Sequence, residues 1–79
     1  MVAAADPYTD CTTATVESVS EDGSVITLSG GRRYSVREEQ RFLSAMWIAD
    51  DEVTVCDPGT STDARITHRG DVIYAARAR

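Results

Sequence analysis

Cys11, Cys56 and His68 are the residues of this chain whose types could support covalent chemistry. An imidazole beside a thiol can remove its proton and create a nucleophilic thiolate. A disulfide bond between the two cysteines would remove that thiolate. An even number of cysteines in a small domain favours the disulfide when the compartment is oxidising. We therefore predict a Cys11–Cys56 disulfide and no catalytic residue, with a Cys56–His68 pair as the alternative.

His68 is the only histidine, and it shares a face with Ile66 if residues 64–68 form a strand. We expect it to be a partly covered residue at a strand end rather than a catalytic base. The Arg69-Gly70-Asp71 sequence that follows matches the integrin-adhesion tripeptide. Because Gly-Asp is also typical of a hairpin turn, we expect a turn there.

Two acidic segments, Asp50-Asp51-Glu52 and Asp57 to Asp63, could offer oxygen ligands to calcium. The second segment has an alternating series of oxygen-bearing residues, but it lacks the third carboxylate and the bidentate glutamate of an EF-hand. We expect solvated turn acids in both segments, and hence no metal and no other cofactor.

One basic cluster surrounds Tyr34. On an OB-like face, such arginines and aromatic rings could stack on single-stranded bases. The cluster consists of Arg32, Arg33, Arg37 and Arg41. Strand alternation turns Tyr34 toward the core, and the neighbouring glutamates dilute the positive charge, so we expect a solvated strand edge. The same four arginines, with Phe42 and Trp47, are our candidate contacts for a protein partner. Trp47 is expected to fill the core, and its exposure beside Phe42 is the alternative.

The chain has 79 residues, a net charge of −5 and 42% hydrophobic residues, as expected for one small globular domain. All eight basic residues are arginine, so no lysine is available for Schiff-base chemistry. The acidic balance disfavours general binding to nucleic acids or anionic membranes. No apolar run approaches the roughly 20 residues of a membrane-spanning helix.

Residues 1–10 are predicted to be a flexible lead-in, and residues 11–79 a single β-barrel domain. Residues 1–7 resemble the small-residue end of a signal peptide, so we expect a processed periplasmic or secreted protein. An intracellular protein with an alanine-rich tail is the alternative.

Alternating hydrophobic residues and turn pairs predict six short strands with one helical insertion. The expected strands are residues 12–20, 24–29, 32–36, 52–56, 64–68 and 72–78, with a short helix within residues 37–48. Val16 and Val19 are three residues apart, which predicts a bulge near Glu17. Phe42, Leu43, Met46 and Trp47 have helical spacing and are expected to plug one end of the barrel.

The stretch Trp47 to Val53 resembles the W-x-x-G-D-x-V segment of small exported bacterial proteins with SH3-like barrels, although Ala49-Asp50-Asp51 replaces the usual Pro-Gly-Asp. The resemblance implies an SH3-like barrel of five or six antiparallel strands, with an OB-fold as the alternative. Many such proteins have no assigned activity.

From these observations we expect an exported, non-enzymatic protein–protein interaction or accessory module of a bacterial envelope or extracellular assembly. An intracellular barrel that binds single-stranded nucleic acid is the alternative. An open strand edge, at Arg32–Val36 or in the carboxyl-terminal strand, would also permit homo-oligomerisation.

Overall fold

The computed structural model describes residues 8–58 and 63–78. Much of the predicted lead-in and the middle of the 57–63 turn therefore lie outside the described residues. The strands are β1 (Cys11–Val19), β2 (Val25–Leu28), β3 (Arg32–Val36), β4 (Glu52–Cys56), β5 (Ala64–His68) and β6 (Asp71–Ala78). A 3₁₀ turn, η1 (Glu38–Gln40), and a single helical turn, α1 (Arg41–Ser44), lie between β3 and β4.

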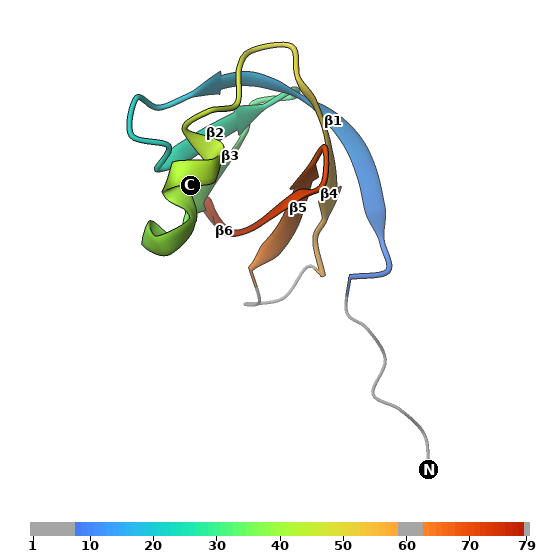
Figure 1. The fold of residues 1–79 in the computed structure, drawn as a ribbon. Helices are drawn as coiled ribbons and strands as arrows, with labels where there is room; N and C mark the ends of the chain where they lie inside the picture. Colours follow the sequence, from blue (N-terminus) through green and yellow to red (C-terminus); the bar gives the residue numbers. More distant parts are fainter. Residues whose placement is uncertain (1–7, 59–62, 79) are drawn as a thin grey trace.

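The six strands form a closed antiparallel barrel in the order β1-β2-β3-β6-β5-β4 (Figure 1). The prediction of a small all-β barrel with one helical turn is confirmed. The finer choice between SH3-like and OB topology stays a prediction. The expectation of an open strand edge is wrong, because β3 and β6 pair with each other and close the barrel.

β1 is long enough to pair with two different neighbours. Cys11 to Thr15 pair with β4, whereas Val16 to Val19 pair with β2. The register shifts between Val16 and Ser18, which leaves Glu17 as the extra residue of a bulge. The bulge predicted from the spacing of the two valines is therefore confirmed, and it bends the strand from one sheet partner to the next.

The turn between β5 and β6 consists of Arg69 and Gly70. Both have positive φ, at 48° and 90°, as in a two-residue type I′ hairpin turn. His68 and Asp71 face each other across the hairpin. The Arg69-Gly70-Asp71 tripeptide is thus explained by hairpin geometry, as expected from the sequence.

Inward-facing side chains fill the barrel. The core consists of Ala14, Val16, Ile26, Leu28, Tyr34, Val36, Trp47, Val53, Val55, Ala64, Ile66, Ile73 and Ala75. Trp47 is only 4% exposed, which confirms its predicted role as a core residue. In β6 the inward face is that of Ile73 and Ala75, so the face shared by Val72, Tyr74 and Ala76 is the outer one.

Residues 37–51, which we call the cap, cross one end of the barrel. β3 and β4 are not neighbours in the closed order, so the chain between them must pass over an open end. Figure 1 shows this path as the green helical segment followed by the yellow loop to β4. We call this end of the barrel the cap end.

The cap differs from the predicted helix in which side chains face the barrel. Leu43 and Trp47 pack against the core, whereas Phe42 and Met46 are exposed. Each pair is separated by four residues, so the two pairs form separate stripes on a helical surface. The prediction that all four residues plug the barrel is therefore wrong for Phe42 and Met46, because a single helical turn can bury only one stripe.

Tyr8, placed by the sequence in the lead-in, packs on the outer surface of the barrel. Its hydroxyl donates to the backbone oxygen of Asp63 at 2.9 Å, and its ring lies edge-on to Tyr74. The guanidinium of Arg65 lies 4.8 Å from the centroid of the Tyr8 ring. These contacts hold the segment before β1 against β5 and β6. Within residues 8–58 and 63–78, no helix has the length and apolar character needed to cross a membrane.

Candidate functional site

The cap presents the largest exposed apolar side chains of the described part of the chain. Phe42, Met46 and Ile48 are 69%, 81% and 67% exposed. We call these three side chains the cap surface. Val72, which is 38% exposed, is the second residue of β6 and lies at the same end of the barrel. Large apolar residues gathered in one short segment are typical of a contact surface, because single exposed residues are usually scattered.

The cap surface rests on a segment that is fixed from three sides. The Ser44 hydroxyl, fully buried, donates to the backbone oxygen of Gly23 at 2.7 Å. The backbone N–H of Tyr74 donates to the side-chain oxygen of Gln40 at 2.7 Å. Nε of Arg41 donates to the backbone oxygen of Val36 at 3.0 Å. The cap is therefore a positioned element of the fold, and the exposed side chains are presented on a fixed backbone.

Asp51 joins the end of the cap to the end of β5. Its carboxylate accepts the backbone N–H of Ile48 at 3.0 Å and contacts Nε2 of His68 at 2.9 Å. The backbone N–H of Val16 also donates to the Asp51 carbonyl oxygen at 2.8 Å. The Ile48 N–H, and then the His68 ring, hold the pKa of Asp51 below its usual value, while burial opposes this shift. Asp51 thus fixes Ile48 relative to the barrel.

His68 is buried between Asp51 and Trp47. Its ring lies 4.8 Å from the Trp47 ring, centroid to centroid, with 31° between their planes. Nε2 faces the carboxylate, and Nδ1 is buried with no hydrogen-bond partner in the described part of the chain. A general base needs a nitrogen within reach of its substrate. Nε2 of His68 is engaged by Asp51 and Nδ1 is buried, so the arrangement suits a structural link better than proton transfer.

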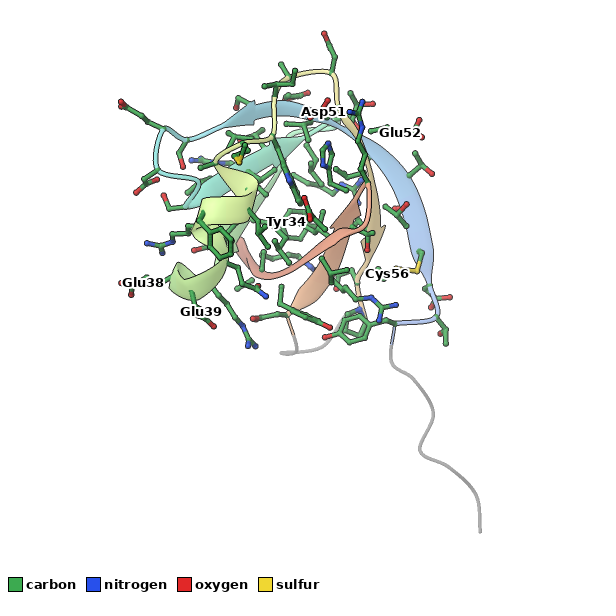
Figure 2. The ribbon with its side chains drawn as sticks, in the orientation of Figure 1. Tyr34, Glu38, Glu39, Asp51, Glu52 and Cys56 are labelled. Atoms are coloured by element: carbon green, nitrogen blue, oxygen red, sulfur yellow. A yellow bond between two sulfur atoms is a disulfide. The ribbon has the colours of Figure 1, made fainter. Side chains whose placement is uncertain are left out.

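Cys11 and Cys56 form the predicted disulfide, with their Cα atoms 4.1 Å apart. The two cysteines are directly opposite each other in the β1–β4 pairing, and Figure 2 shows the bond beside the start of β1. Cys56 is buried, on the face opposite to Val53 and Val55, as strand alternation predicted. The bridge removes the thiolate that a Cys56–His68 pair would require.

The four candidate arginines do not converge on one site. Arg37 forms an ion pair with Asp63 at 2.7 Å and lies over the Tyr74 ring, and Arg41 is bound to the Val36 backbone. The exposed Arg32 and Arg33 line two different surface depressions, of about 440 and 270 Å³. Only two of the four therefore remain available to a partner.

Tyr34 is fully buried, as Figure 2 shows, and cannot stack a base. Its burial confirms the inward direction predicted from strand alternation, and the nucleic-acid hypothesis then rests on the arginines. Stacking on an aromatic ring is a major part of the affinity of single-strand binding barrels.

Three of the acids considered for calcium are bound by other groups, whereas Asp50 and Glu52 are exposed. Asp57 binds Arg77 through both carboxylate oxygens, at 2.6 and 2.8 Å, and Asp63 binds Arg37. Among the residues that the structure describes, no group of three or more acidic, histidine or cysteine side chains could hold a metal ion. Gly59 and Ser61 of the proposed loop belong to the undescribed segment.

Sequence reasoning missed the exposure of Met46 and Ile48, and the packing of Tyr8. Comparison with protein-family models, with curated proteins and with solved structures found no match. The function of the chain must therefore be inferred from its own residues.

Proposed function

We propose that this protein is a non-enzymatic binding module of a bacterial envelope or extracellular assembly, and that it recognises another protein through the cap surface. The observation that carries the proposal is the exposure of Phe42, Met46 and Ile48 on a fixed segment. Large apolar and aromatic side chains supply most of the binding energy at protein interfaces. A presenting segment that is already ordered lowers the entropic cost of binding.

The disulfide supports the extracytoplasmic part of this proposal, because structural disulfides persist in oxidising compartments and are rare in the cytosol. We propose a periplasmic or secreted location. Rapid alkylation of source cells followed by intact mass measurement should find Cys11 and Cys56 bridged. Two alkylated thiols in the cellular protein would contradict this location.

The binding role is tested by capture of partners from the extracytoplasmic fraction of the source organism. The protein carrying Phe42→Ser and Met46→Ser should lose at least about tenfold of the captured partner, since truncated hot-spot residues cost 2 kcal/mol or more. Thr54→Ala, on the outer face of β4, is the matched control and should capture as the wild type does. Equal capture by all three proteins, each with an unchanged melting temperature, would refute the proposal.

A further inference from the structure

The negative charge of this protein is concentrated at the cap end. Segments 20–24, 37–52 and 69–71 meet there, because Gly23 contacts Ser44 and His68 contacts Asp51. They contain eight acidic and three basic residues, a surplus that equals the net charge of −5 of the whole chain. The acids are Glu21, Asp22, Glu38, Glu39, Asp50, Asp51, Glu52 and Asp71, and the bases are Arg37, Arg41 and Arg69.

Most of these acids are free to act on a partner. Asp22 is bound by Ser20 and Ser24, and Asp51 by Ile48 and His68. The other six are exposed and form no ion pair among the described residues. Figure 2 shows Glu38 and Glu39 projecting outward from the helical segment that carries Phe42. The cap end therefore combines the three exposed apolar side chains of the cap surface with six exposed acids, which we call the acidic rim.

Resting on the function proposed above, we infer that the partner of the cap surface is a cationic amphipathic segment of another protein. Its large apolar side chains would cover Phe42, Met46 and Ile48, and its lysine or arginine side chains would face the surrounding glutamates and aspartates. Opposite charges around an apolar contact accelerate association and exclude partners of the wrong sign. Apolar and charged residues arranged on opposite sides of a short segment are a common recognition mode.

The same charge distribution argues against three other possible occupants of this surface: a second copy of the chain, an anionic lipid surface and a nucleic acid. A symmetric dimer through the cap would place two acidic rims against each other, because a two-fold interface repeats the same patch on both copies. Anionic lipid surfaces and nucleic acids would be repelled for the same reason. The acidic rim therefore selects a basic partner.

Two synthetic helical peptides test this inference, with identical leucine faces and either lysine or glutamate on the polar face. Titration calorimetry at 50 mM salt should show that the lysine peptide binds at least about tenfold more tightly. Its affinity should fall at least about tenfold with Phe42→Ser/Met46→Ser, and about threefold with Glu38→Gln/Glu39→Gln. Asp10→Arg, which changes the net charge by the same two units before the start of β1, should change affinity less than twofold.

Equal or tighter binding of the glutamate peptide would overturn the inference, as would no binding of the lysine peptide. Equal losses from the Glu38→Gln/Glu39→Gln and Asp10→Arg proteins would also overturn it, since attraction to total charge would then explain the binding. These failures are distinguishable from failure of the proposed function. Partner capture that still depends on Phe42 and Met46 would leave the binding role standing and refute only the basic partner.

Discussion

Asp51 is the residue on which the cap end depends most directly. One carboxylate fixes the backbone of Ile48 and holds the ring of His68, which in turn stacks on Trp47. Exposed and buried parts of the cap are therefore joined through a single charged group. Its neighbour Asp50 has a positive φ of 75° and an exposed side chain, so the two adjacent acids have different roles.

We predict that Asp51→Asn lowers the urea midpoint of unfolding at pH 7. An amide oxygen binds the Ile48 N–H and the His68 ring more weakly than a carboxylate does. Because the folded state lowers the pKa of Asp51, its contribution is present above the unfolded pKa and is lost as pH falls through the folded value. The loss of stability relative to the wild type should therefore be largest at pH 7 and should shrink toward pH 2. Asp50→Asn is the control and should leave the midpoint nearly unchanged, since Asn also tolerates positive φ. A similar loss in both variants would contradict the role given to Asp51.

Gly23 is a second residue that fixes the cap. A Cβ atom there would lie 2.3 Å from the Arg41 backbone oxygen and 2.8 Å from the Ala45 backbone nitrogen, and φ is +77°. We predict that Gly23→Ala costs about 3 kcal/mol or more, from the sum of overpacking and left-handed strain. Gly70→Ala, with φ of +90° but open space around it, should cost only about 1–2 kcal/mol. Chemical denaturation measures both values, and equal costs would contradict the close packing at Gly23.

At the scale of elements, the cap shows what the sequence could and could not predict. Helix-forming residues and apolar spacing correctly predicted a helical turn, and the size and position of Trp47 correctly predicted its burial. The direction in which α1 faces the barrel depends on where β3 and β4 lie in the closed order, which is a long-range property. Local spacing therefore could not decide which of the two apolar stripes would be buried.

Truncating a buried side chain of the cap should change the stability of the protein more than truncating an exposed one. We predict that Trp47→Ala costs about 3–5 kcal/mol, because it empties part of the core. Phe42→Ala should change the free energy of unfolding by no more than about 0.5 kcal/mol, since its side chain is exposed. Urea unfolding monitored by circular dichroism measures both changes. A loss at Phe42 comparable to the loss at Trp47 would place Phe42 in the core and remove it from the cap surface.

At the scale of the whole molecule, the disulfide joins two neighbouring strands that are far apart in sequence. Cys11 and Cys56 are separated by 45 positions, and the chain between them contains β2, β3 and the cap. The pairing of the cysteines was predictable from their even number together with the expected oxidising compartment. The strand order was not, because alternation and turn residues identify strands without specifying their non-local partners.

Removing the disulfide should strongly destabilise the barrel. Chain-entropy arguments assign about 4 kcal/mol to a loop of this length, and a domain of this size has a total stability of roughly 4–12 kcal/mol. We predict that the Cys11→Ser/Cys56→Ser protein loses about 2–5 kcal/mol and is partly unfolded at 37 °C. Thermal unfolding of this protein, and of the wild type with and without reductant, measures the effect. An unchanged transition after reduction would contradict a structural role for the bond.

We propose that another protein docks on the cap surface outside the cytoplasm. Photo-crosslinking in living source cells tests it most directly, with a photoreactive amino acid placed at Met46 or, as the control, at Thr54 on the barrel wall. We predict one discrete crosslinked product from position 46, formed by the disulfide-bonded protein, and none from position 54. No product from position 46, or the same product from both positions, would contradict the claim.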